Sequence, residues 1–292
     1  MCKFFSGIAF KNGDIYYNPM TDSHEDLVAE KELDDTVVLS SVKRNWVRFE
    51  YTSDNLADLK TYMLKIDESS SPTWCDKEFL ENLEDKSKNI VKAMILHKVE
   101  KKILVGGCWL LTGGSIIDKV VNVRIILLES SSVKQMRGSS SVKQMWGSSS
   151  VNEMWESSSV NEMRESSSVN EMRESSSVNE MRESSSVNEM LGSSSVNEMR
   201  ESSSVKQMWG SSSVKQMRGS SSVNEMWGSS SVNEMRESSS VKQMLESSSV
   251  KQMWGSSSVN EMLESSSVNE MLESSKILAD NRINKSLAKE MR

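Results

Sequence analysis

The chain has 292 residues, of which 35 are Lys or Arg and 42 are Asp or Glu, so its formal net charge is −7. Hydrophobic residues make up 36%, which is low for a globular domain and high for a fully disordered chain. Two prolines and three cysteines exclude the collagenous and disulfide-stapled classes. Composition alone indicates no biochemical activity.

The cysteines and the apolar segments favour a cytoplasmic location. Cys2, Cys75 and Cys108 are widely spaced and odd in number, which predicts buried small side chains and no disulfide framework or zinc site. The first residues lack the length and the cleavage site of a signal peptide. The most apolar stretch, residues 103–128, carries four charged or amide side chains, so we expect no membrane span.

Residues 1–100 have ordinary composition and predict a small α+β head domain. Ile8–Phe10 and Ile15–Tyr17 flank the pair Asn12-Gly13, which is a strong hairpin signal. Further along, alternating apolar residues predict paired strands at Trp46–Tyr51 and Thr61–Ile66.

Two helices are expected in the head. The second follows Ser71-Pro72-Thr73 and runs for about twenty residues. Its apolar face is predicted to contain Phe79, Leu80, Leu83, Ile90, Val91, Met94 and Ile95. The glycine pairs of the chain fit neither a P-loop nor a dinucleotide-binding motif, and no nucleophile elbow occurs.

The first helix begins at the only concentrated polar cluster of the head, residues 22–26. Ser23 and Asp26 have the spacing of a capping box, so we favour a helix start. The alternative is chemical, because a His among acids is suited to general-base or metal-ligand work. Asp22, His24 and Glu25 are therefore the candidate head site.

Residues 101–129 form a strand-like run punctuated by Gly106-Gly107 and Gly113-Gly114. We expect this run to form the first irregular coils and to cap the repeat domain of residues 130–275. That domain holds sixteen tandem nine-residue units of the form S-S-S-V-(K/N)-(Q/E)-M-(R/W/L)-(G/E), without insertion or deletion. So strict a register predicts stacking of equivalent units, as in a solenoid.

A β-solenoid fits the repeats best. A helix is excluded because nine residues make about 2.5 turns, which leaves no continuous apolar stripe. Disorder is the alternative, since Ser, Glu, Asn and Lys are typical of it. In the first unit Ser131 and Val133 share one face of a strand. Met136 follows three residues after Val133, so we expect the chain to turn between them, with one corner in each unit.

The fifth and sixth positions bear on the length of a coil. Lys-Gln units and Asn-Glu units occur in identical adjacent pairs along the whole array. This pairing favours an 18-residue coil made of two units. Duplication of a two-unit block of DNA explains it equally, and a triangular coil of three units is a further alternative.

The eighth position holds seven Arg, five Trp and four Leu, and the ninth holds only Gly or Glu. Such free exchange predicts an exposed position near a corner. Arg and Trp dominate binding hot spots, although neutral variation on a solvated face is the simpler interpretation. The candidate binding residues are Arg137, Trp146, Trp155, Arg164, Trp209, Trp227 and Trp254.

Charge and composition narrow the partners of the repeats. They carry 13 positive and 19 negative side chains, a difference of −6, which disfavours direct nucleic-acid binding. They contain no Asp, which calcium-binding nonapeptides need, and none of the Thr typical of ice-binding ladders. We expect no cofactor and no metal.

The segment 276–292 is interpreted as a C-terminal cap, with an amphipathic run through Leu287 and Met291. Uncapped solenoid ends stack on one another. End-to-end or side-by-side self-association is therefore a further expectation.

Several motifs resemble an uncharacterised family found in bacteriophages and gut bacteria. They are MCKFFSGIAFKNGDIYY at 1–17, TDSHEDLV at 21–28, RFEY at 48–51, LKIDESSSPTWCD at 64–76, the ILVGG-to-repeat junction and DNRI at 280–283. The family combines a small head with nonapeptide repeats of the form A-Q-I-Q-S-V-W-G-S. Ser131 and Val133 match its small and branched inward positions, and Met136 replaces a Val. The resemblance implies a phage or prophage origin and no established activity.

These observations favour a non-enzymatic interaction or structural protein. Its solenoid would be a rigid rod or binding surface, and its head would bind an unknown host or phage protein in the host cytoplasm. A counter-defence factor that imitates nucleic acid is the first alternative. The second is an enzyme whose site surrounds His24.

Overall fold

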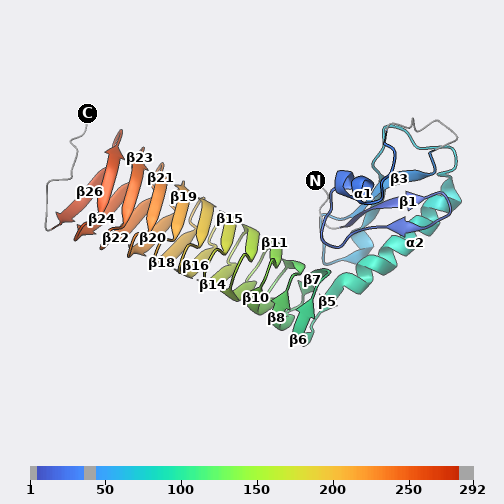
Figure 1. The fold of residues 1–292 in the computed structure, drawn as a ribbon, viewed down its shortest axis with the longest axis horizontal. Helices are drawn as coiled ribbons and strands as arrows, with labels where there is room; N and C mark the ends of the chain where they lie inside the picture. The colour runs from blue at the N-terminus through green and yellow to red at the C-terminus, as the bar shows by residue number, and fades with distance from the viewer. Residues whose placement is uncertain (1–4, 36–43, 283–292) are drawn as a thin grey trace. The chain divides into compact units, whose positions relative to one another are not determined.

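The computed structural model describes residues 5–35 and 44–282, and the chain divides into two compact units, Met1–Leu96 and His97–Arg292 (Figure 1). Within these residues the first unit is an α+β head with a small antiparallel sheet, and the solenoid has about ten turns built from two parallel sheets. The predictions for Cys2, Leu287 and Met291 lie outside the described residues. No helix of the described part is long and apolar enough to cross a bilayer.

The head sheet has the strand order β2-β1-β3-β4. Its strands are β1 (Phe5–Phe10), β2 (Ile15–Tyr16), β3 (Trp46–Thr52) and β4 (Met63–Ile66), and η1 (Leu59–Thr61) precedes β4. The predicted hairpin is confirmed, because β1 pairs antiparallel with β2 and Gly13 adopts a φ of 84° in the turn. The predicted pairing of the two later strands is confirmed as well, with Phe49 opposite Ile66.

The short helix α1 (His24–Glu30) begins at the predicted capping box. Ser23 Oγ accepts a hydrogen bond from the backbone N–H of Asp26 at 3.2 Å, which satisfies one amide of the first turn. Leu27 is fully buried and packs with Ile8 and Trp46, so the helix is held against β1.

The long helix α2 (Lys77–Met94) begins a few residues later than the Ser-Pro-Thr segment predicts. Asp76 caps it by accepting the Phe79 N–H at 2.9 Å. Its buried residues are Leu83, Ser87, Val91 and Met94, so three of the seven predicted face residues are fully covered. Ile95 was predicted on this face but begins the next strand.

The solenoid places even-numbered strands in one sheet and odd-numbered strands in the other, with eleven described strands in each (Figure 1). The first coils comprise β5 (Ile95–His97), β6 (Glu100–Val105), β7 (Cys108–Thr112), β8 (Ile116–Val121) and β9 (Arg124–Leu127). The later strands are β10 (Ser132–Arg137), β11 (Ser141–Met145), β12 (Ser150–Met154), β13 (Ser159–Met163), β14 (Ser168–Met172), β15 (Ser177–Met181), β16 (Ser186–Met190), β17 (Ser195–Met199), β18 (Ser204–Met208), β19 (Ser213–Met217), β20 (Ser222–Met226), β21 (Ser231–Met235), β22 (Ser240–Met244), β23 (Ser249–Met253), β24 (Ser258–Leu263), β25 (Ser267–Met271) and β26 (Lys276–Asn281).

Each repeat strand pairs in parallel with the second strand after it. Val133 lies opposite Val151, and Met136 lies opposite Met154. Facing residues are thus 18 apart, so one coil comprises two units and the triangular alternative is wrong. The coils before the repeats are shorter, because Glu100 faces Ile116, sixteen residues later.

Three columns of identical side chains fill the interior of the repeats. The second Ser, the Val and the Met of each unit are at most 1% exposed from Ser131 to Met262. Met suits this thin core because its unbranched chain fills irregular gaps. The inward orientation predicted for Ser131, Val133 and Met136 is confirmed.

The predicted turn between Val133 and Met136 is wrong. Strand β10 continues through both residues, and the corner lies after Arg137. Lys134 and Gln135 both lie on the outer side, and the backbone pairing with the next coil passes from Val133 to Gln135 and omits Lys134. This local irregularity shifts the alternation by one residue and returns Met136 to the core.

The Gly/Glu exchange at the ninth position reflects a conformational requirement rather than free variation. The ninth residue adopts a left-handed φ in either case, 65° at Gly138 and 60° at Glu156. Gly accepts this conformation without strain. The strain of a left-handed Glu is offset by a hydrogen bond, since the Glu156 carboxylate accepts the Gly138 N–H from the preceding coil at 2.6 Å.

Candidate functional sites

The candidate binding residues of the repeats fall on two separate edges of the solenoid. A coil has two corners, so the eighth residues that follow even-numbered strands line one row of corners and those that follow odd-numbered strands line the other. Arg137, Trp155, Trp209 and Trp227 belong to the first row, and Trp146, Arg164 and Trp254 belong to the second.

We call the row after the odd-numbered strands the arginine edge. In chain order its eighth residues are Trp146, Arg164, Arg182, Arg200, Arg218, Arg236, Trp254 and Leu272. We call the other row the apolar edge, and its eighth residues are Arg137, Trp155, Arg173, Leu191, Trp209, Trp227, Leu245 and Leu263. The exchange pattern predicts exposed side chains at this position, but all of them except Arg236 are half-buried.

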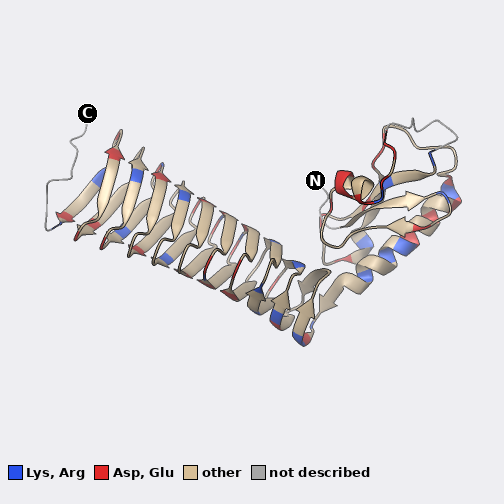
Figure 2. Ribbon diagram, in the orientation of Figure 1, with Lys and Arg blue, Asp and Glu red and all other residues tan. Residues whose placement is uncertain are grey.

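The cations of the arginine edge are paired with glutamates at the sixth position. Arg200 Nη2 lies 2.9 Å from Glu198 and its Nε lies 3.0 Å from Glu180, so one guanidinium bridges two coils. Arg182 does the same, at 2.8 Å from Glu180 and 3.8 Å from Glu162. Acidic and basic residues are accordingly interspersed along the solenoid (Figure 2). Such a network holds the side chains in place and leaves little free positive charge for phosphates.

The apolar edge contains two stacks of planar side chains. Trp155 lies between Arg137 and Arg173, whose guanidinium carbons are 4.4 and 4.5 Å from its ring centroid. Trp209 and Trp227 stack on each other with centroids 4.9 Å apart and planes 10° apart. Cation–π and aromatic stacking thus occur along this edge beside the ion pair between Arg173 and Glu171.

The indole of Trp227 is also fixed by a carboxylate. Its Nε1 donates to Glu225 Oε2 at 3.1 Å, and Gln207 Nε2 donates to the same oxygen at 2.9 Å. These hydrogen bonds, from Gln207 and then from Trp227, lower the pKa of Glu225 below its ordinary value.

In the head, His24 is held between two acceptors. Its Nδ1 lies 3.0 Å from Asp67 Oδ2, and its Nε2 lies 3.0 Å from the backbone oxygen of Phe49. These two contacts hold the imidazole ring of His24, the first residue of α1, against β3 and the residue that follows β4. Both nitrogens are engaged by these groups and not by Asp22 or Glu25, the partners predicted from the sequence.

Asp22, His24 and Glu25 nevertheless line one open hollow of about 520 Å³. The other lining residues are Ser23, Asp35, Arg48, Glu50 and Asp67. Carboxylates dominate this wall, and Arg48 is paired with Asp35 at 2.5 Å. Among residues 5–35 and 44–282, no three His, Cys, Asp or Glu side chains form a group suited to a metal ion.

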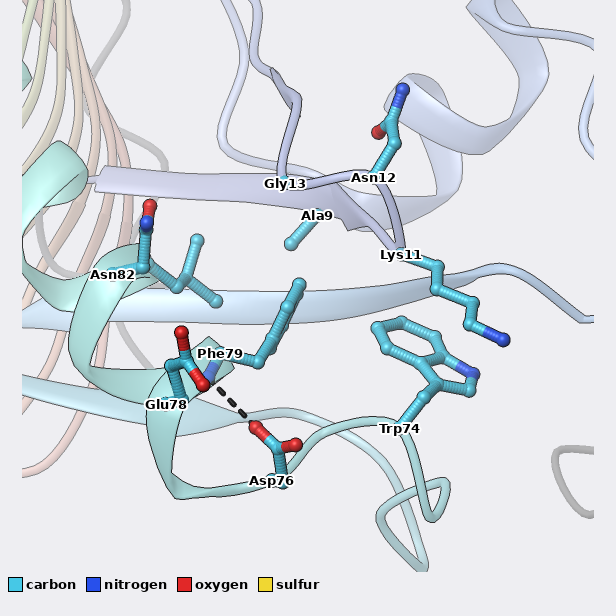
Figure 3. Close-up of a pocket in the computed structure, with 10 residues that line it drawn as sticks. Ala9, Lys11, Asn12, Gly13, Trp74, Asp76, Glu78, Phe79 and Asn82 are labelled. Carbon is cyan, nitrogen blue, oxygen red and sulfur yellow. Dashed lines mark hydrogen bonds between the residues drawn. The ribbon is translucent and has the colours of Figure 1, made fainter.

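A second hollow of the head, of about 400 Å³, was not found by sequence reasoning (Figure 3). The hairpin turn forms one wall, and the segment that enters α2 forms the other. Trp74 and Phe79 provide an aromatic wall, with rings in edge-to-face contact at 5.1 Å. Lys86 Nζ holds the two walls together by donating to the Gly13 oxygen at 2.6 Å. The lining residues are Ala9, Lys11, Asn12, Gly13, Trp74, Asp76, Glu78, Phe79, Asn82 and Leu83.

The two described cysteines are buried, as predicted. Burial, and secondarily the nearby Asp76 and Glu68, raise the pKa of the Cys75 thiol to about 11. A thiol with so high a pKa is a poor nucleophile at neutral pH.

Comparison of the chain with protein-family models, with curated proteins and with solved structures finds no match.

Proposed function

We propose that this is a non-enzymatic interaction protein of phage or prophage type. Its sixteen repeat units form one continuous rigid rod, and its head binds a host or phage macromolecule. The observation that carries the proposal is the sorting of the eighth residues into two chemically different edges, each continuous over many coils. Contact surfaces of this kind are typical of solenoids that serve as scaffolds.

The aromatic hollow beside the hairpin is the best candidate for the contact made by the head. It combines Trp74 and Phe79 with the exposed polar side chains of Lys11, Glu78 and Asn82. An aromatic centre with a polar rim is the usual composition of a protein-binding patch.

The two alternatives have less support. A nucleic-acid mimic needs carboxylates directed to solvent, whereas Glu180 and Glu198 pair with arginines and Glu183 accepts a backbone N–H. An enzyme working through His24 needs a ring nitrogen that is free to accept a proton. In His24, however, Nδ1 contacts the Asp67 carboxylate and Nε2 contacts the backbone oxygen of Phe49.

The proposal is tested by capture from host lysate with the full-length chain, with and without nuclease. We expect a macromolecule that is retained by the wild type and released by Lys11→Glu combined with Asn82→Arg. Glu25→Lys, which alters the other hollow, is the matched control and should retain it. Equal retention by all variants would place the contact elsewhere. A catalytic turnover lost in His24→Gln would favour the enzyme.

A further inference from the structure

Four consecutive coils of the apolar edge carry a symmetric run of side chains. Strands β16, β18, β20 and β22 are neighbours in one sheet and are followed by Leu191, Trp209, Trp227 and Leu245. Read in either direction, this column is Leu-Trp-Trp-Leu. Its centre is the stacked pair Trp209–Trp227, at 4.9 Å between ring centroids.

The corner beside this column carries little charge. The ninth residues that follow the first three side chains are Gly192, Gly210 and Gly228, and only the fourth, Glu246, is charged. Glycine projects no side chain beyond the rings, so another surface can approach them closely. The run is thus a neutral apolar patch on a rod whose repeats have a net charge of −6.

The arginine edge of the same coils has the opposite character. Arg182, Arg200, Arg218 and Arg236 follow β15, β17, β19 and β21. Their guanidinium groups are already bound to glutamates of the sixth position, so this stretch offers no apolar contact surface. Of the two edges, only the apolar edge carries uncharged eighth residues over four consecutive coils in the middle of the rod.

We propose that two copies of the chain pair side by side and antiparallel along the apolar edge. A two-fold axis between Trp209 and Trp227 places each Trp209 opposite Trp227 of the second copy and each Leu191 opposite its Leu245. Gly192 then faces Glu246, so no two carboxylates meet within these four coils. An interface of this isologous kind closes after two copies.

The size of the patch sets the strength of the pairing. Four coils at about 4.8 Å each extend about 19 Å. A patch of four side chains is much smaller than the interfaces of permanent dimers, which bury about 2,000 Å² or more. We therefore expect a reversible dimer. This inference goes beyond the proposed function and does not rest on the identity of any partner.

The first test is sedimentation equilibrium of the full-length chain across the micromolar range. Trp209→Arg combined with Trp227→Arg should weaken dimerisation at least about tenfold. The fold tolerates this change, because Arg occupies the eighth position in seven other units. Trp254→Arg, on the arginine edge, is the matched control and should dimerise like the wild type. A wild type that stays monomeric, or a double variant that dimerises equally well, overturns the proposal.

The second test distinguishes the antiparallel arrangement from other assemblies. Ser193 and Ser247 are exposed corner residues beside the two ends of the patch. In a Cys2→Ser background, oxidation of a mixture of Ser193→Cys and Ser247→Cys chains should give a cross-linked heterodimer, and neither chain alone should cross-link. Cross-linking of Ser193→Cys with itself would show a parallel pair. Growth of larger oligomers with concentration would show an open assembly, and each outcome contradicts the two-fold pairing.

Discussion

The backbone N–H of Glu165 donates a hydrogen bond to the carboxylate of Glu183, one coil further along, at 3.1 Å. Both residues adopt a left-handed φ of 57°, a conformation that costs an ordinary side chain about 1 kcal/mol. The cross-coil hydrogen bond offsets this strain and explains how Glu alternates with Gly at the ninth position.

Substitution of Glu183 separates the two contributions. Glu183→Ala loses the hydrogen bond and keeps the strain, so we expect a loss of about 1–2 kcal/mol in the free energy of unfolding. Glu183→Gly loses the same bond but removes the strain, and it should be about 1 kcal/mol more stable than the Ala variant. Chemical denaturation followed by circular dichroism measures both. Equal stability of the two variants would contradict a strained corner.

The buried serine column contains hydroxyls in two states. Ser140 Oγ donates to the Arg137 oxygen at 2.6 Å, whereas Ser203 Oγ has no hydrogen-bond partner among the described residues. Ser203→Ala should therefore leave the denaturation midpoint unchanged or raise it, because an unsatisfied buried hydroxyl is removed. Ser140→Ala should lower the free energy of unfolding by about 1 kcal/mol. A reversed order would show that the central hydroxyls are bonded after all.

The methionine column should be the most sensitive part of the rod. Met208 is completely buried, and Lys206 on the same strand is exposed. Met208→Ala leaves a cavity and should cost about 2–5 kcal/mol. Lys206→Ala should change stability by less than about 0.5 kcal/mol. Similar midpoints for the two variants would indicate that the Val–Met layer does not hold the coils together.

Acid should weaken the apolar edge through Glu225. Its pKa in the folded chain is lowered by the hydrogen bonds from Gln207 and Trp227, relative to an ordinary value of 4.5. The stabilisation is therefore present above pH 4.5 and is lost as the pH falls through the lower folded value. The stability difference between wild type and Glu225→Gln should shrink below that pH, as measured by denaturation monitored through tryptophan fluorescence. A difference that is constant from pH 7 to pH 3 would exclude Glu225 as the titrating group.

A buried ion pair should dominate the stability of the head. Arg44 and Glu68 are each 4% exposed and lie 2.7 Å apart, and Glu68 also accepts the Arg48 N–H at 3.0 Å. Glu68→Ala leaves the Arg44 cation buried beside a weaker partner and should cost about 3–5 kcal/mol. Glu78→Ala, an exposed change in the same unit, is the control. Loss of near-ultraviolet dichroism at a lower temperature in Glu68→Ala alone is the expected result.

The repeat fold could be predicted well from the sequence because the same residue types recur every nine positions. The inward Ser131, Val133 and Met136 follow from the nine-residue spacing, and the paired Lys-Gln and Asn-Glu units indicate the two-unit coil. The irregularity at Lys134 was missed, because a strand that keeps two successive residues outside breaks the alternation on which strand prediction relies.

The sites were predicted less completely, because their composition depends on tertiary contacts. The eighth residues were predicted to form a single surface, but an 18-residue coil places those of alternate units on different edges. Sorting them by the 18-residue coil was possible from the sequence alone. The aromatic hollow was not, since Asn12 and Trp74 are far apart in the chain and meet only when α2 packs on the hairpin.

The most direct test of the account is cross-linking within the rod, because both edges and the proposed pairing depend on the two-unit coil. Asn188 Nδ2 donates to Asn170 Oδ1 at 3.1 Å in the neighbouring strand. In a Cys2→Ser background, Asn170→Cys with Asn188→Cys should form an intramolecular disulfide under mild oxidation, detected by mass spectrometry. The pair at 170 and 179, on opposite sheets, should remain reduced. A disulfide between cysteines at 170 and 197 instead would show a three-unit coil and contradict the assignment of both edges.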